Sequence, residues 1–150
     1  MAIDRNGAVH IVWPTLVDGP EPATRLFHAS TADGITFTPR QVFQTLGSPK
    51  PAHPQMTLDR CGDLALVWDE AQDKTRRIAL ATLGTSAGSP TGRSVALNGE
   101  LAGRYPVVAT SGGGALIAAW TELGRDSEHS SIAVRRLEST CAQLPARTTD

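Results

Sequence analysis

A short apolar pattern that ends in tryptophan occurs three times in this chain. The copies run from Gly7 to Trp13, from Gly62 to Trp68 and from Gly114 to Trp120. Their tryptophans lie 55 and 52 residues apart, so the pattern recurs at a nearly constant period. Self-similarity at such a period is typical of folds that stack copies of one supersecondary unit. The repeat therefore constrains the architecture more strongly than any local pattern does.

The similarity extends to the residues before each glycine. Counting back from the tryptophans aligns Pro54 with Pro106 and Asp59 with Ser111. The first copy matches only over its last residues, where Asp4 corresponds to Asp59. We therefore expect the chain to begin inside a unit of a single repeat domain. The expected units are approximately 1–48, 49–101 and 102–150.

Each unit is expected to form four short strands. Ten prolines and fourteen glycines separate short aliphatic or β-branched runs, which is the pattern of strands and turns, and no segment shows helical periodicity. The Gly-to-Trp segments are the second strands. The first strands are expected at 54–58 and 106–110, the third at 25–30, 77–82 and 131–136, and the fourth at 40–45, 93–97 and after Thr140.

The second strands carry apolar residues on both faces, as in Leu64–Trp68. A strand in a sheet with one solvent-exposed face would alternate apolar with polar residues. These strands do not, so their sheets are expected to be covered on both sides. The blades of a β-propeller are sandwiched in this way between their neighbours. We therefore expect an all-β propeller of four-stranded antiparallel blades, with about three blades per chain, half of a six-bladed ring. A β-sandwich of about eleven strands is the alternative, but it does not explain the period.

The composition excludes several classes of function. The net charge of −1 and the pI near 6.4 do not favour nucleic acid or an anionic membrane, which select basic patches. No apolar run is long enough to span a membrane as a helix. No signal-peptide pattern begins the chain, so the compartment stays open between the cytosol and a chain that lacks its leader. Two free thiols are expected for Cys61 and Cys141, with a bridge between them as the alternative.

The histidines show no spacing typical of a metal site, so neither a metal nor a cofactor is expected. His10 and His28 fall within expected strands and are interpreted as structural. Arg76 and Arg77 are interpreted as solvated or sheet-edge residues, with anion binding as the alternative. We expect the three repeat tryptophans to fill the gaps between neighbouring sheets.

The segment from Ser30 to Phe37 reads Ser-Thr-Ala-Asp-Gly-Ile-Thr-Phe. It resembles the Asp-box, Ser-x-Asp-x-Gly-x-Thr-Trp, of sialidase-type (BNR-repeat) propellers. Ser30, Gly34 and Thr36 match, Phe37 replaces the tryptophan, and Asp33 stands one place after the aspartate position. The box is expected to close a hairpin, with Gly34 at positive φ and Phe37 packed between blades. Its residues, Asp33 included, are therefore interpreted as structural rather than catalytic.

In sialidase-like propellers the active site lies on the face opposite the Asp-boxes. Strand alternation places on that face the connections from second to third strands and those between units. Arg104-Tyr105-Pro106 resembles the Arg-Ile-Pro motif of sialidases, whose arginine clamps the substrate carboxylate. The second unit has Ala52-His53-Pro54 there, without the arginine. The candidate ligand-binding residues on this face are Arg104, Tyr105, His53, Asp69, Glu70 and Glu122.

The two glutamates each lie two residues after a repeat tryptophan. Paired carboxylates perform glycoside hydrolysis at suitable separations, whereas acidic residues after a strand are more commonly solvated. The resemblance implies that a working sialidase needs three carboxylate-binding arginines, a tyrosine nucleophile with a glutamate partner, and an aspartate acid/base. This chain has one tyrosine, Tyr105, and one motif arginine, Arg104. No complete catalytic set is visible, so no catalytic residue is assigned.

Three functions of different classes remain at this point. The favoured one is a noncatalytic module that binds a glycan, peptide or small ligand. The alternatives are a sialidase-like exo-glycoside hydrolase and an assembly unit. Three blades do not close a ring and leave apolar blade faces exposed, so the expected partner is a second copy of the chain or further blades of a longer chain.

Overall fold

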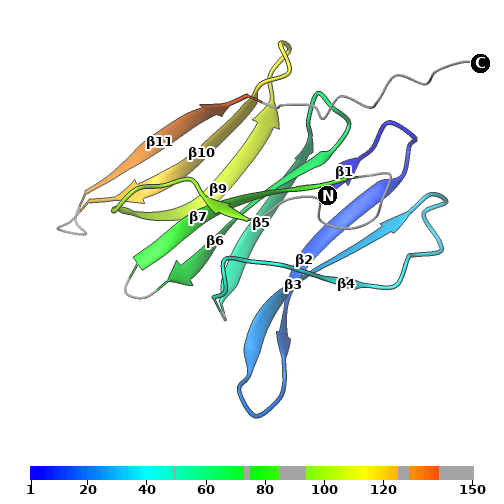
Figure 1. Ribbon diagram of the computed structural model, residues 1–150, viewed down its shortest axis with the longest axis horizontal. Helices are drawn as coiled ribbons and strands as arrows, with labels where there is room; N and C mark the ends of the chain where they lie inside the picture. Colours follow the sequence, from blue (N-terminus) through cyan, green and yellow to red (C-terminus); the bar gives the residue numbers. More distant parts are fainter. Residues whose placement is uncertain (49, 73–74, 85–93, 125–128, 139–150) are drawn as a thin grey trace, which may run out of the picture.

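The computed structural model describes residues 1–48, 50–72, 75–84, 94–124 and 129–138. These residues form three antiparallel sheets and contain no helix (Figure 1). Sheet 1 contains β1 (Ala2–Ile3), β2 (Val9–Val17), β3 (Ala23–Thr31) and β4 (Gln41–Phe43), in that order. Sheet 2 contains β5 (Pro51–Leu58), β6 (Leu64–Gln72), β7 (Thr75–Leu83) and β8 (Val95–Ala96). Sheet 3 contains β9 (Ala102–Thr110), β10 (Leu116–Leu123) and β11 (Ser130–Leu137).

The expected all-β class is confirmed, and each expected strand within the described residues has a counterpart. Sheet 2 lies between sheets 1 and 3, and the first strands β5 and β9 contact each other across the sheet boundary (Figure 1). The expected fourth strand of the third unit, after Thr140, falls outside the described residues. No described helix is long and apolar enough to cross a membrane.

The same turn joins the first and second strands of every sheet. Its first residue is Asp4, Asp59 or Ser111, whose backbone N–H donates to the carbonyl four residues later at 2.9, 2.7 and 2.8 Å. The side chain of that residue accepts the N–H four residues later at 2.9, 3.0 and 3.1 Å. The fourth position needs a positive φ, which glycine adopts without strain. It is Gly7, Gly62 and Gly114 in the three turns, with φ between 81° and 90°. The alignment of the three units is therefore confirmed at these turns.

The core is organised around β6. Leu66 and Trp68 point toward sheet 1, where Trp68 meets Phe43 edge to face at 5.7 Å between ring centroids. The alternate residue Val67 packs toward sheet 3, with Trp120. The prediction that a second strand is covered on both faces is confirmed for β6, which is buried from Leu64 to Glu70.

The same prediction is wrong for β2. Trp13 is only half-buried, and it stacks on Phe27 within its own sheet at 6.0 Å between ring centroids. Sheet 1 has a neighbour on one side only among the described residues, so the residues on the other side of β2 lack a covering layer. Repeat membership alone therefore does not determine how deeply an equivalent residue is buried.

The Asp-box-like segment forms a tight turn after β3, as expected for a structural element. The Asp33 carboxylate accepts hydrogen bonds from the N–H groups of Thr36 (2.7 Å) and Ile35 (2.8 Å), and from the Thr31 hydroxyl (2.9 Å). These hydrogen bonds hold the pKa of the Asp33 carboxyl well below its usual range, and the bond from Thr36 has the largest effect. Gly34 has the expected positive φ of 74°. The expected packing of Phe37 between sheets is wrong, since Phe37 is 47% exposed.

Cys61 is disulfide-bonded, and the described residues contain no free cysteine. The expectation of two free thiols is therefore wrong for Cys61. The only other cysteine of the chain, Cys141, lies outside the described residues. The sequence pattern did not decide between the two states because one pair of cysteines carries no framework spacing.

Candidate functional site

Two non-glycine residues of the described chain have a left-handed backbone, and they occupy the same position of the repeat. His53 has a φ of 51° and Tyr105 a φ of 55°. Each precedes a proline, which normally favours an extended backbone at the residue before it. Each also coincides with a register shift in the pairing of its strand, β5 with β6 and β9 with β10. Backbone strain of this kind is concentrated at functional sites, so the two residues mark a candidate site.

The strained backbone brings the two rings together at the junction of sheets 2 and 3. The centroids of the His53 and Tyr105 rings lie 4.6 Å apart, with planes tilted by 59°. Both side groups face solvent, with 47% of the His53 side chain and 56% of Tyr105 exposed. An exposed corner of two rings is unusual in a chain in which only 5% of residues are Phe, Trp or Tyr. The rings form an accessible apolar and aromatic surface.

A fully buried carboxylate lies beneath these rings. One oxygen of Asp69, Oδ2, accepts the backbone N–H of Tyr105 at 3.0 Å and contacts His53 Nδ1 at 2.7 Å. The other oxygen, Oδ1, accepts the Arg76 Nε–H at 2.7 Å and forms the salt bridge with the same guanidinium. Asp69 therefore links β5, β7 and β9 in one polar network. We call His53, Asp69, Arg76 and Tyr105 the junction site.

The network fixes the hydrogen-bonding character of its exposed atoms. An ionised carboxylate only accepts, so the proton of neutral His53 lies on Nδ1, and Nε2 is left as an acceptor. Arg76 keeps 24% of its side chain exposed, and a guanidinium has more donors than Asp69 uses. The junction site thus presents rings, donors and an acceptor within one small area at the end of the sheets opposite the Asp59 and Ser111 turns.

The structure separates the six candidates predicted from the sequence. It joins His53, Asp69 and Tyr105 in one site. Arg104 is exposed, and its guanidinium has no hydrogen bond or ion pair with the rest of the described chain. Glu122 is half-buried on β10 opposite Gly103, and none of the described hydrogen bonds connects it to the junction site.

Glu70 has a structural role. The two interpretations of Glu70 from the sequence, as a solvated carboxylate and as a catalytic one, are therefore both wrong. It is completely buried and accepts the Trp68 Nε1–H at 2.6 Å. It also accepts the backbone N–H groups of Leu46 and Ser48, each at 3.2 Å. Glu70 therefore ties the connection between sheets 1 and 2 to β6 instead of facing a ligand.

Arg76 was missed as a site residue by sequence reasoning, which interpreted it as solvated. The available signal was its spacing, because Asp69 and Arg76 are seven residues apart across a hairpin. Arg76 pairs with Ala71, two residues from Asp69, so the two charged side chains are diagonal neighbours on one face of sheet 2. The described residues contain no group of three or more metal-binding side chains.

The comparisons with known proteins identify a similar fold but show no family. No family model matches the sequence, and no curated protein matches it. The structure is similar to a fucose lectin from Kordia zhangzhouensis, solved in complex with methyl-fucoside. The TM-score is 0.57 and the identity 13%, over 89% of this chain and 88% of the lectin chain. A mannose phosphorylase from Leishmania mexicana, in complex with phosphate, gives a TM-score of 0.49 and 9% identity, and this chain spans 44% of its length. The likeness to the lectin shows a shared all-β fold.

Proposed function

We propose that this protein is a noncatalytic carbohydrate-binding module with a propeller-like arrangement of sheets, and that the junction site holds the sugar. The observation that carries the proposal is the exposed ring pair of His53 and Tyr105 above the Asp69–Arg76 pair. A sugar ring has an apolar face of C–H groups and a rim of hydroxyls. Aromatic rings cover the first, and a few placed polar groups bind the second. The shared fold with a fucose lectin supports the same ligand class.

In this proposal each residue of the junction site has a role of its own. The Tyr105 and His53 rings pack against the apolar face of the sugar, while Arg76 donates hydrogen bonds to hydroxyl oxygens. His53 Nε2 accepts from a sugar hydroxyl. Asp69 is covered by its partners and acts as a positioning residue, because its carboxylate holds the other three groups in place.

The test is a glycan screen that includes fucosides, followed by calorimetric titration of the best ligand. Replacing Tyr105 by alanine is expected to weaken binding by about tenfold or more, as is common for central aromatic contacts. Phe37→Ala is the matched control, since Phe37 is an exposed ring in the turn after β3. Binding that survives both Tyr105→Ala and His53→Ala would refute this site.

The sialidase-like alternative remains a prediction that rests on the Asp-box-like segment and on Arg104. It requires turnover, whereas the proposed module requires binding without turnover. Hydrolysis of a fluorogenic sialoside that is lost in Arg104→Ala would overturn the noncatalytic proposal.

We also propose that two chains assemble into a ring of six blades. Ile78 and Ile132 occupy the same repeat position, each paired with the residue after a repeat tryptophan. Ile78 is fully buried against Gly103 of β9, where an added Cβ would lie 2.5 Å from Ile78 Cγ1. Ile132 is 69% exposed. The face of sheet 3 that corresponds to a packed face of sheet 2 is therefore open among the described residues.

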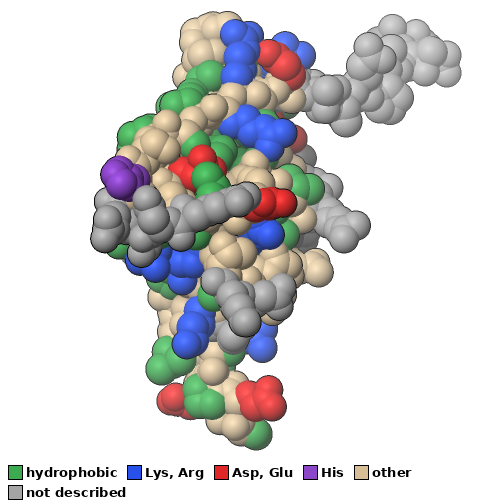
Figure 2. All heavy atoms as spheres, turned by 90° about the vertical axis from the view of Figure 1, so that its left-hand side faces the viewer, with side chains coloured by type: hydrophobic (Ala, Val, Ile, Leu, Met, Phe, Trp, Pro, Cys, Tyr) green, Lys and Arg blue, Asp and Glu red, His purple; other side chains and the backbone are tan. Residues whose placement is uncertain are grey.

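The opposite side of the molecule shows the complementary feature. Ile11 and Trp13 of β2 are half-buried, whereas their equivalents Leu66 and Trp68 are completely buried against sheet 1. The open face of sheet 3 corresponds to the face with which sheet 2 packs on sheet 3, and the open face of sheet 1 corresponds to the face with which sheet 2 packs on sheet 1. A second copy covers both open faces at once around a two-fold axis. On the side nearest β11, the basic side chains of Lys and Arg lie scattered and form no single patch (Figure 2).

Sedimentation equilibrium is expected to give twice the chain mass of 15.8 kDa. Ile132→Glu should yield monomers, because a charge on the buried face of an interface is left unpaired. Ile35→Glu, which changes an exposed isoleucine in the turn after β3, should leave the dimer intact. A wild-type protein that remains a folded monomer at high concentration would refute the two-chain ring and favour further blades of a longer chain.

A further inference from the structure

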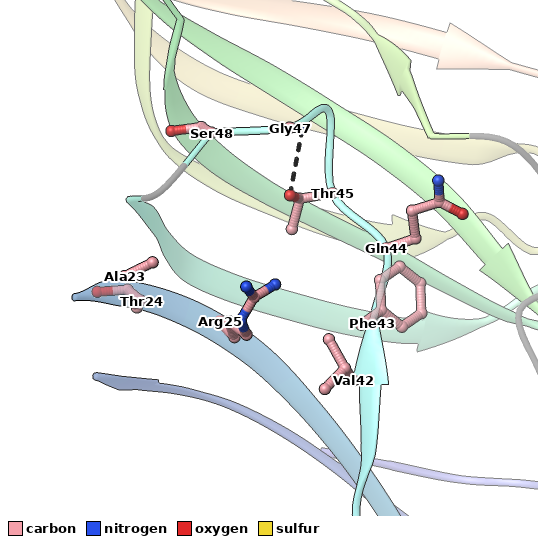
Figure 3. Close-up of a pocket in the computed structure, with 9 residues that line it drawn as sticks. All are labelled: Ala23, Thr24, Arg25, Val42, Phe43, Gln44, Thr45, Gly47 and Ser48. Atoms are coloured by element: carbon pink, nitrogen blue, oxygen red, sulfur yellow. Dashed lines mark hydrogen bonds between the residues drawn. The ribbon is translucent and has the colours of Figure 1, made fainter. Parts of the chain in front are cut away.

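A pocket of about 410 Å³ lies between the beginning of β3 and the segment after β4, and none of its lining residues belongs to the junction site. Figure 3 shows the Arg25 side chain projecting from β3 into the space beneath Thr45 and Gly47. The lining also includes the polar residues Thr24 and Ser48. No carboxylate lines the pocket, so the charge of Arg25 is not offset within it.

The equivalent of Arg25 in sheet 2 is Arg77, and it shows the role of this position when the guanidinium has a hydrogen-bond partner. Arg25 pairs with Thr15 and Arg77 with Glu70, and both partners lie two residues after a repeat tryptophan. The Arg77 guanidinium donates to the carbonyl of Gly99 in the next connection. The Arg25 guanidinium has no hydrogen bond or ion pair with any described residue. The same position is therefore a structural tie in sheet 2 and an unpaired cation in sheet 1.

A second repeat position explains why space is left beside Arg25. Gln44 and Asn98 are equivalent, since each stands two residues after the fourth-strand residue that pairs with the equivalent third-strand position, Phe27 or Ala79. Asn98 is buried and its side-chain amide bridges β7 to the next connection, with hydrogen bonds to Ile78 N–H (2.7 Å), Arg76 O (3.1 Å) and Leu101 O (2.7 Å). Gln44 is exposed, and Figure 3 shows its amide directed away from Arg25. The crevice that Asn98 fills in sheet 2 is thus open in sheet 1.

We propose that the Arg25 pocket is a second ligand site, which takes the carboxylate of a small polar molecule such as a uronic acid. A guanidinium binds a carboxylate through two parallel hydrogen bonds, and this geometry is specific as well as strong. The polar residues Thr24, Thr45 and Ser48 also line the pocket, and its volume is within the range of small-molecule sites. This site is independent of the junction site and does not require that the sugar proposal holds.

The test compares glucuronate with glucose, which lacks the carboxylate, by NMR titration of protein labelled with ¹⁵N. Glucuronate is expected to shift the Arg25 side-chain Nε–Hε signal and the Gly47 amide in a saturable manner, while glucose leaves both unchanged. Arg25→Gln should weaken glucuronate binding by about tenfold or more, because it removes the charge and the bidentate donor. Far-UV circular dichroism verifies that the variant is folded.

Arg40→Gln is the matched control, since Arg40 directly precedes β4 and its guanidinium lies over the Phe27 ring, 4.7 Å from the ring centroid. It removes the same charge outside the pocket and should leave glucuronate binding unchanged. Equal losses in Arg25→Gln and Arg40→Gln would show general charge attraction and overturn the proposal. So would equal shifts with glucose, or the absence of any saturable shift. The Tyr105→Ala variant should bind glucuronate normally, which separates this site from the junction site.

Discussion

Asp69→Asn is expected to lower the free energy of unfolding by about 3 kcal/mol and to abolish binding at the junction site. The carboxylate is fully buried, and it accepts from Arg76, His53 and the backbone of Tyr105 at once. An amide keeps one accepting oxygen but turns an N–H₂ group toward the other donors, which leaves the Arg76 charge without its partner. Loss of one partner from a buried ion pair costs roughly 3–5 kcal/mol, and the partial exposure of Arg76 places the expected value at the low end.

Chemical unfolding monitored by tryptophan fluorescence measures this effect. Glu122→Gln provides the matched control, because Glu122 is half-buried at the end of β10 and no described hydrogen bond connects it to the junction site. Its expected change is about 0.5 kcal/mol or less. If Asp69→Asn proved as stable as Glu122→Gln, the carboxylate would not be the support of the site.

Acidification from pH 7 to pH 4 is expected to remove about 3 kcal/mol of stability through His28 alone. Burial, with the charge of neighbouring His10 as the second cause, lowers the pKa of His28 from 6.5 to about 4. The unfolded chain therefore binds this proton first as the pH falls. The contribution of neutral His28 is complete above pH 6.5 and is lost progressively down to about pH 4.

The groups around His28 form a buried chain. His10 Nδ1 lies 3.0 Å from His28 Nε2 with the two rings stacked, and His10 Nε2 lies 3.4 Å from Asp4 Oδ2. Burial raises the pKa of Asp4, but the hydrogen bonds from the Ala8 and Asn6 amides and the contact with His10 outweigh it, so its pKa is lowered. Because its folded pKa is depressed, Asp4 loses its contribution only below about pH 4, in a separate window.

Unfolding curves recorded between pH 7 and pH 4 for the wild type and for His28→Gln isolate the histidine term. The variant should show a flatter dependence on pH across this window, even if it is less stable at pH 7. Identical slopes for the two proteins would contradict the role assigned to His28.

The fold followed from the sequence wherever its determinants are local and repeated. The turns at Asp4, Asp59 and Ser111 were predictable because one polar side chain and one glycine satisfy each of them within five residues. The second strands were predictable from their continuous apolar runs. The burial of Trp13 was not, since it depends on whether a neighbouring sheet covers β2.

The candidate site was predictable only in part, for a related reason. His53 and Tyr105 were found through their common place in the repeat, but their meeting depends on the packing of sheet 2 against sheet 3. Arg76 and Glu70 were misjudged because charged residues at the ends of strands are normally solvated. Glu70 is buried because a loop 22 to 24 residues earlier folds over it, and no local pattern records that contact.

The central claim is that a sugar binds at the junction of sheets 2 and 3, and the Tyr105 backbone amide reports on it most directly. This N–H donates to Asp69 beneath the exposed rings. Titration of ¹⁵N-labelled protein with methyl-fucoside, and with the best ligand of the glycan screen, should shift the Tyr105 amide saturably while the turn at Asp33 stays unchanged. Saturable shifts confined to the Asp33 turn, or a Tyr105 amide that no glycan moves, would contradict the account.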